Sequence, residues 1–111
     1  MMNKEHRKGL QADYRRKVAR PGIYALRASD GGVWVGAASD LDAIANRVLF
    51  TLRQGTSPHR SLQAAWNAAG EGGLAWEELE ELDGEELGLA VPRVLKERHL
   101  HWRETLGATR I

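Results

Sequence analysis

The sequence predicts an α+β domain in which a small antiparallel sheet of about three strands is flanked by helices. Two observations lead to this fold class. Short apolar runs flank the turn sequence Ser29-Asp30-Gly31-Gly32 on both sides, a pattern typical of a β-hairpin. Later segments repeat apolar residues every three or four positions, with Ser, Pro and Gly at their ends, as amphipathic helices do. The length of 111 residues suits a single domain over 1–111.

The first segment, residues 1–20, is expected to form a basic N-terminal helix. Leu10, Tyr14 and Val18 recur every four positions, and most of their neighbours are charged or polar. Pro21 then ends the helix. The first strand is expected at about residues 22–28.

The hairpin continues with a second strand at about 33–37, and Gly31 or Gly32 can supply the positive φ of the turn between the strands. Ser39 is expected to cap a helix that runs to about Gln54, where Gly55 follows as a C-cap.

Ser57 and Pro58 are expected to start the next helix, with Ser57 as its cap. The glycine-rich stretch 70–73 ends that helix, and residues 74–82 then alternate between apolar and acidic. The glutamates in this segment favour a helix, whereas its position after a glycine loop permits a short strand. The last helix is expected from about residue 91 to 106.

Charge is unevenly distributed along the chain. Residues 1–60 hold 11 Lys or Arg against 5 Asp or Glu, a net +6, whereas residues 61–111 hold 5 against 10, a net −5. One basic half can contact phosphate groups while the other half stays away from them. The chain has no cysteine, no apolar stretch long enough for a membrane span and no signal peptide, so we expect a cytoplasmic location without membrane contact.

The hairpin carries two short segments, Gly22-Ile23-Tyr24 and Trp34-Val35-Gly36, that together resemble the two tripeptides after which the GIY-YIG nuclease family is named. The resemblance covers about residues 20–105, in the family's order of hairpin, helix, helix, third strand and helix. It implies that residues 74–80 form the third strand. The second tripeptide departs from the family's pattern, because its tyrosine is replaced by Trp34.

The resemblance implies an endonuclease that hydrolyses DNA phosphodiester bonds with one Mg²⁺ or Mn²⁺ ion. In the family, a tyrosine accepts a proton from the attacking water, an arginine stabilises the phosphate and a glutamate holds the ion. Tyr24 matches the tyrosine. The arginine's position is Ile44, so the role passes to Arg47, one helical turn further along, with Asn46 as a weaker candidate.

The glutamate's position, three residues before the aromatic Trp102, is His99, so either His99 replaces the carboxylate or Glu97 serves as the metal ligand. Trp34, in the place of the second tyrosine, joins the site by this resemblance. Its indole N–H donates and accepts nothing, so it cannot act as a base. Trp34 is expected to hold the sheet together, or alternatively to stack on an unpaired base.

DNA is the expected partner, and the chain could also act as a homodimer or with a separate recognition subunit. Phosphate contacts that carry no sequence information are expected from basic residues at the start of the chain and around the helix junction: Arg15, Arg16, Lys17, Arg20, Arg53 and Arg60. The alternative is a domain that has kept the fold without cleavage and serves as a nucleic-acid-binding or protein-interaction module.

Overall fold

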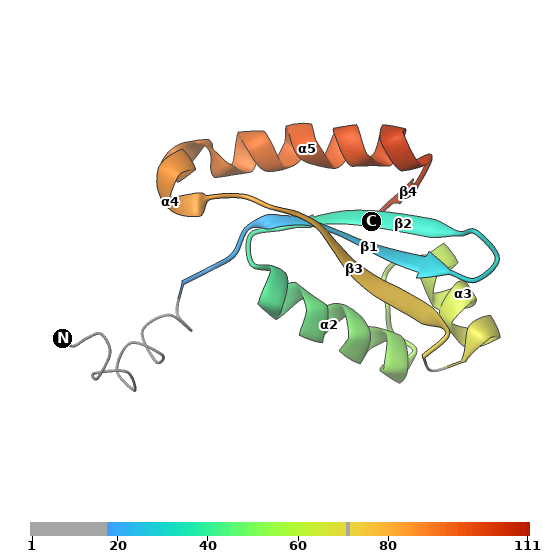
Figure 1. Cartoon of the computed structure of the whole chain (residues 1–111). Coiled ribbons are helices and arrows are strands. Elements are labelled where there is room, and N and C mark those ends of the chain that lie inside the picture. Colours follow the sequence, from blue (N-terminus) through green and yellow to red (C-terminus); the bar gives the residue numbers. More distant parts are fainter. Residues whose placement is uncertain (1–17, 71) are drawn as a thin grey trace.

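A computed structural model of the chain describes residues 18–70 and 72–111 (Figure 1). The helix expected over residues 1–20, with Arg15, Arg16 and Lys17, therefore lies outside the described residues except for its last three positions. Those three positions, 18–20, are not helical.

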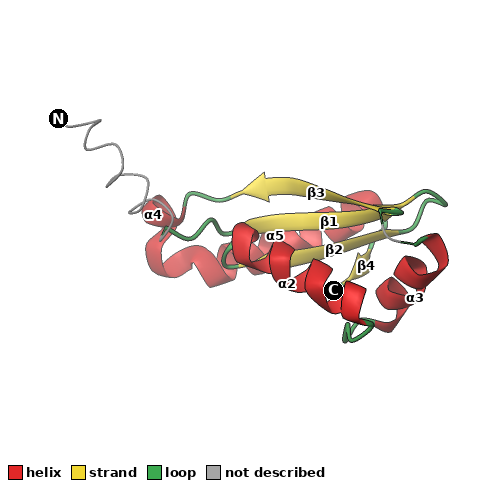
Figure 2. Ribbon diagram, turned by 90° about the horizontal axis from the view of Figure 1, so that it is seen from below, coloured by secondary structure: helices red, strands yellow, loops and turns green. Residues whose placement is uncertain are grey.

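The centre of the fold is a sheet with the strand order β3-β1-β2-β4 (Figure 2). It contains β1 (Gly22–Ala28), β2 (Val33–Ala38), β3 (Leu74–Glu81) and β4 (Thr109–Arg110). The strand β1 pairs antiparallel with both β2 and β3, whereas the short β4 pairs parallel with β2. The three expected antiparallel strands are confirmed, and β4 is an addition that its two residues were too short to predict.

The hairpin turn between β1 and β2 forms as its sequence indicates. Asp30 accepts a hydrogen bond from the backbone N–H of Gly32 at 3.0 Å, and the Gly32 carbonyl accepts one from Ala28 at 2.8 Å. Gly31 adopts a φ of 98°, which a side chain would disfavour.

Helices cover both faces of the sheet (Figure 1). Two helices, α2 (Leu41–Gln54) and α3 (Arg60–Ala69), lie on one face, and α5 (Val91–Leu106) lies on the other. A short helix, α4 (Gly84–Leu87), and a 3₁₀ turn (Gly88–Ala90) connect β3 to α5. This arrangement confirms the predicted α+β class.

Two predicted helix caps are wrong in detail. The cap of α2 is Asp40 and not Ser39, because the Asp40 carboxylate accepts the backbone N–H of Asp42 at 3.2 Å. The helix α3 begins at Arg60, two residues later than Pro58 indicated, because Ser57 forms a local turn by accepting the N–H of His59 at 3.2 Å.

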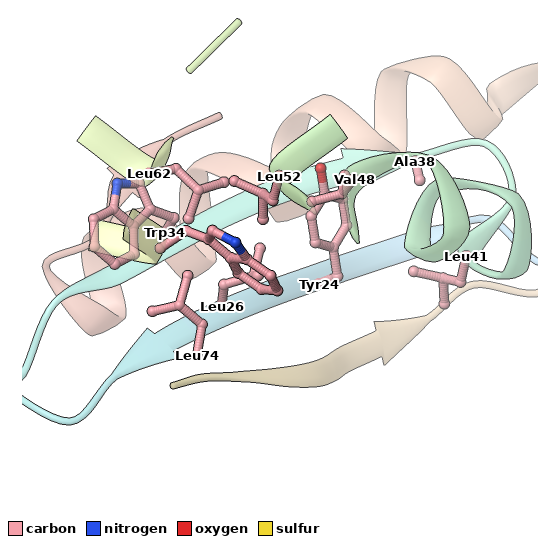
Figure 3. Close-up of a cluster of buried hydrophobic side chains, with 10 residues drawn as sticks. Tyr24, Leu26, Trp34, Ala38, Leu41, Val48, Leu52, Leu62 and Leu74 are labelled. Atoms are coloured by element: carbon pink, nitrogen blue, oxygen red, sulfur yellow. The ribbon is translucent and has the colours of Figure 1, made fainter. Parts of the chain in front are cut away.

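The core is divided between the two faces of the sheet. The larger cluster lies between the sheet and α2 and α3 (Figure 3), and its buried members are Tyr24, Leu26, Trp34, Ala38, Leu41, Val48, Leu52, Leu62, Trp66 and Leu74. The smaller one faces α5 and consists of Ile23, Ala25 and Val35, with Leu95, Trp102 and Leu106 packed against them. Among the described residues, no helix has the length and apolar character that a membrane crossing requires.

Candidate functional site

Tyr24 lies in β1, an inner strand, on the face of the sheet that α2 and α3 cover (Figure 3). Its side chain is 3% exposed. One face of its ring stacks on the Trp76 ring of β3, with the ring centroids 4.7 Å apart and the ring planes 10° from parallel. The neighbouring strand β2 places Gly36 opposite it in register.

Gly36 makes room for Tyr24. A Cβ atom at Gly36 would lie within 2.4 Å of both Cζ and the hydroxyl oxygen of Tyr24, which is closer than real atoms approach. The glycine of the second tripeptide therefore has a physical role here, because it lets the tyrosine hydroxyl lie directly over the backbone of β2.

Burial raises the pKa of Tyr24 from 10.0 to about 12, and the nearby positive charge of Arg47 lowers it by a smaller amount. The phenol is therefore protonated at neutral pH. A protonated, enclosed phenol can donate a hydrogen bond to an anion, whereas it is a weak proton acceptor in this state.

The junction of β2 and α2 contains a hollow of about 290 Å³. Arg47 and Ile44 line it from α2, and Ser39 and Asp40 line it from the preceding turn. Ile44, at the position of the family's arginine, also packs against the larger core cluster. Arg47 is exposed and makes no ion pair with any described residue. The charge of Arg47 is thus near enough to Tyr24 to lower the pKa of its phenol.

Trp34 is a buried part of the same core cluster. Its indole N–H donates a hydrogen bond to the Ser61 hydroxyl of α3 at 2.9 Å. This contact fixes the β-hairpin to α3, and it uses the indole's single polar group. The geometry corresponds to the expected role of Trp34 as an aromatic that holds the sheet and its helices together.

Glu97 does not join Tyr24 and Arg47. It lies on α5, which covers the opposite face of the sheet, and its side chain is 58% exposed. Its carboxylate pairs with Arg93 one turn earlier on the same helix at 3.1 Å. The expected convergence of tyrosine, arginine and carboxylate is therefore not formed, because the sheet separates the carboxylate from the other two.

His99, at the position of the family's glutamate, is buried at the outer edge of β2. Its Nε2 lies 2.9 Å from the carbonyl oxygen of Val35. Because a carbonyl only accepts, Nε2 carries the proton of this hydrogen bond. Burial lowers the pKa of His99; the bond to Val35 opposes this, and the charges of Arg103 and Arg110 lower it further.

The residues present do not fit the divalent ion that the resemblance implies. Among the described residues, no three His, Asp or Glu side chains gather closely enough to hold a metal ion. Glu97 is already paired with a cation, and His99 is a neutral nitrogen donor already engaged with the backbone. Mg²⁺ prefers carboxylate and water oxygens, so this position offers it a poor ligand.

Arg20, an expected phosphate contact, is engaged within the protein. Its guanidinium makes ion pairs with Asp42 at 2.7 Å, with Glu78 at 2.8 Å and with Glu81 at 2.8 Å. The hydrogen bonds to Asp42, Glu78 and Glu81 raise its pKa well above its usual range. Arg20 therefore connects the chain entry to α2 and β3, and its charge is neutralised there.

The other expected phosphate contacts, Arg53 and Arg60, are both exposed on the helix side of the sheet. Arg53 lies in the last turn of α2, and Arg60 begins α3. Together with Arg47 they place three arginines on α2 and α3, where the acidic residues are limited to Asp42.

Two features of the site could not be read from the sequence. Trp76 stacks on Tyr24 only because β3 lies beside β1, a pairing that no local pattern encodes. Glu80 accepts hydrogen bonds from Arg98 at 2.8 Å and from the Trp102 indole at 2.9 Å, on the α5 face. The alternation of the 74–82 segment indicated which residues share a face, without indicating their partners.

Solved structures with a similar arrangement are known. The catalytic domain of the homing endonuclease I-TevI superposes with a TM-score of 0.68 at 25% sequence identity, covering 82% of this chain and 97% of that one. A mutant of the catalytic domain of the intron endonuclease I-TevI gives a TM-score of 0.64 at 26% identity, covering 79% and 84%. No protein-family model matches the sequence, and no curated protein matches it.

These likenesses define the class of the protein as a domain with the fold of an endonuclease catalytic domain. More narrowly, the fold is that of the GIY-YIG catalytic domain. The resemblance that the two tripeptides indicated is thereby confirmed at the level of the fold.

Proposed function

We propose that this chain is a DNA-binding domain of the GIY-YIG fold that does not carry out metal-dependent cleavage by the family's route. The observation that carries the proposal is the division of the expected site. Arg47 lines the hollow at the β2–α2 junction and is near enough to Tyr24 to lower its pKa, while Glu97 lies across the sheet and pairs with Arg93.

Charge supports DNA as the partner. Arg47, Arg53 and Arg60 are exposed on α2 and α3, whereas β3, which forms one edge of the sheet, carries four glutamates. A duplex or single strand would approach the α2 and α3 side first, because the acidic strand repels its phosphates. The binding would read phosphates and not bases.

Within this site, Arg47 would contact a phosphate oxygen at the mouth of the hollow, and the neutral Tyr24 hydroxyl would add no negative charge to that of Asp40, which also lines the hollow. A buried phenol with a pKa of about 12 does not add a negative charge near the phosphate at neutral pH.

A second candidate function is cleavage by a reduced site. The observation that favours it is the close approach of Gly36 to Tyr24, which leaves no side chain of residue 36 against the tyrosine hydroxyl. This function requires a carboxylate or an ion from elsewhere, and the described residues supply no cluster for one.

The test measures binding and cleavage on the same samples. The purified chain is titrated against a fluorescent duplex at several salt concentrations, and supercoiled plasmid is incubated with it in Mg²⁺, Mn²⁺ or EDTA. We expect binding that weakens with salt, that EDTA does not change and that produces no nicks. Arg47→Gln should lower the salt slope by about one, the contribution of a single phosphate contact.

Arg93→Gln is the matched control, since Arg93 is also exposed but is paired with Glu97 on the opposite face. It should leave binding within error of the wild type. Metal-dependent nicking that Tyr24→Phe abolishes would establish the second candidate instead. No salt-sensitive binding to any DNA would reject both.

A further inference from the structure

The outer edge of β2, away from the acidic strand β3, is surrounded by cationic and titratable side chains. The strand order β3-β1-β2-β4 places β3 at one edge of the sheet and β4 at the other. Arg110 of β4 pairs in register with Val35 of β2. His99 reaches the same Val35 carbonyl from α5. We call His99, Arg103 and Arg110 the β2-edge cluster.

The helix and the last strand bring the cluster together. Arg103 follows His99 by four residues, so the two lie on the same face of α5. The carbonyl of Arg103 accepts the N–H of Ala108 at 2.9 Å, which turns the chain back toward β2 after α5 ends. The N–H of Ile111 then donates to the Val35 carbonyl at 3.0 Å.

The Val35 carbonyl therefore accepts two hydrogen bonds, one from Ile111 and one from the His99 ring. These bonds hold α5 and β4 against the same point of β2. Arg110 is thereby held in register with Val35, and Arg103 lies one helical turn after His99, which bonds to Val35. Both of their charges are near enough to the His99 ring to affect it.

The cluster lacks an anion. Within residues 18–70 and 72–111, neither Arg103 nor Arg110 has a hydrogen-bonded or ion-paired carboxylate. The nearest acid in the sequence, Glu104, is exposed and lies about 100° around the helix from Arg103. The Nε of Arg103 is enclosed and has no acceptor at all.

An enclosed guanidinium nitrogen without an acceptor is unfavourable, because it has lost its water and gained no partner. A small outward rotation of the Arg103 side chain would present its N–H groups to a ligand at the sheet edge. Arginine binds phosphate with two parallel N–H donors, and a second arginine beside it adds another.

We propose that Arg103 and Arg110, positioned by His99 at the edge of β2, bind a phosphate group without a metal ion. His99 occupies the position at which the family resemblance placed a metal-binding glutamate, so this chain presents positive side chains next to the place where a carboxylate and a cation were expected. The phosphate is either a phosphodiester of a nucleic-acid strand, which rests on the proposed function, or a free or terminal phosphate.

The test follows the arginine Nε–Hε resonances of the ¹⁵N-labelled full chain by NMR. The probes are inorganic phosphate, an oligothymidylate with a 5′-phosphate and the same oligomer without one, each at matched ionic strength. We expect the Arg103 resonance to shift with saturation, and the Arg93 resonance, whose side chain is paired with Glu97 on the same helix, to stay in place. Arg103→Gln identifies the signal.

Arg110→Gln serves as the second variant, because Arg110 is exposed in β4 and one-dimensional spectra check directly that the variant is folded. It should weaken phosphate binding about tenfold, the change that follows loss of one hydrogen bond to a charged group. A linear shift of Arg103 and Arg93 alike, or no effect of Arg110→Gln, would overturn the site.

The probes separate this proposal from the DNA-binding function. If the chain binds DNA, if this binding depends on Arg47, and if no probe changes the Arg103 resonance, the proposed function stands and the phosphate site is rejected. If inorganic phosphate shifts Arg103 with saturation while no DNA binds, the phosphate site stands and the DNA-binding function fails. A shift with the 5′-phosphorylated oligomer alone assigns the site to a strand end.

Discussion

The two faces of the sheet use the same kinds of residues for different purposes. On the α2 and α3 face, Tyr24 lies beside Arg47, and no carboxylate takes part in that pair. On the α5 face, a carboxylate is present, and Glu80 is bound by Arg98 and by the Trp102 indole. On the first face the charge of Arg47 therefore stays available to solvent, whereas on the second the carboxylate of Glu80 is paired within the fold.

This difference shows how strongly a sheet separates residues that a linear motif groups together. Adjacent residues of a strand point to opposite faces, so Ile23 packs under α5 while Tyr24 packs under α2. The side chains of a helix that packs on one face of the sheet cannot reach residues on the opposite face. Glu97 is separated from Tyr24 in this way, although the chain order suggested that the two would meet.

The difference between the two faces of the sheet is tested most strongly by removing one core side chain on each face. Leu62 of α3 is fully buried, whereas Leu95 of α5 is only partly buried. We expect Leu62→Ala to lower the free energy of unfolding by about 2–5 kcal/mol, and Leu95→Ala to lower it by less, because the cavity it leaves is open to water. Urea denaturation followed by tryptophan fluorescence measures both.

Leu89, which is fully exposed in the 3₁₀ turn, supplies the control. Leu89→Ala should leave the urea midpoint unchanged, since it removes no buried surface. An equal loss of stability in Leu62→Ala and Leu95→Ala would mean that the two faces contribute equally to the core, and the contrast between them would fail.

The next prediction concerns Gly36, which determines how Tyr24 is seated. Gly36→Ala places a methyl group against the Tyr24 ring, so we expect a loss of about 1–3 kcal/mol in the free energy of unfolding from overpacking. In a Tyr24→Leu background the same substitution should cost much less, because the ring is absent. A double-mutant cycle in urea measures the coupling, and additive effects would show that the two residues do not touch.

On the opposite face, the prediction concerns the carboxylate of Glu80. Burial raises its pKa, but hydrogen bonds from Trp102 and Arg98 lower it more, so the net pKa is below its ordinary value of 4.5. A lowered pKa gives stability that is present above about pH 4.5 and is lost as the pH falls through the native value. Glu80→Gln should cost about 1–2 kcal/mol at pH 7.

The pH dependence provides the check on this assignment. The difference in stability between the wild type and Glu80→Gln should shrink as the pH is lowered from 6 to 3, because the wild-type carboxyl group becomes neutral as well. A constant difference over that range would show that the carboxylate's charge is not what stabilises the native state.

Much of the fold could be predicted from local patterns. The turn at Asp30 and Gly31 and the apolar spacing of the helices depend on residues close in sequence, and the structure confirms them. The strand β4 has two residues and pairs with β2 only because α5 returns the chain there, so no local signal marks it. The N-cap of α2 is Asp40, whereas Ser39 was predicted. Both residue types can cap a helix, and only the packing chooses between them.

The candidate site could be predicted only in part, for the same reason. The nearness of Tyr24 and Arg47 follows from the hairpin and the helix that comes directly after it, which are neighbours along the chain. The position of Glu97 depends on which face α5 covers, and the pairing of Arg20 depends on where β3 ends. Both are long-range outcomes that spacing along the chain does not contain.

The smallest expected effect is on the ionisation of Tyr24, and it bears directly on the face that carries Arg47. Burial raises the pKa of Tyr24 to about 12, and Arg47 lowers it. Arg47→Gln should therefore raise this pKa by a few tenths of a unit, as expected for one partly solvated charge. Absorbance at 295 nm in a Tyr14→Phe background follows Tyr24 alone, because the chain has two tyrosines.

The sign of the accompanying stability change follows from the raised pKa. The unfolded tyrosine ionises near pH 10, so native stability should fall as the pH rises from 10 toward 12. Arg53→Gln, about one and two-thirds turns further along α2, is the matched control and should move the Tyr24 pKa less. If Tyr24 titrated near 10 in the native protein, its ring would be accessible to water, and a role as a proton acceptor would become the better account of this face.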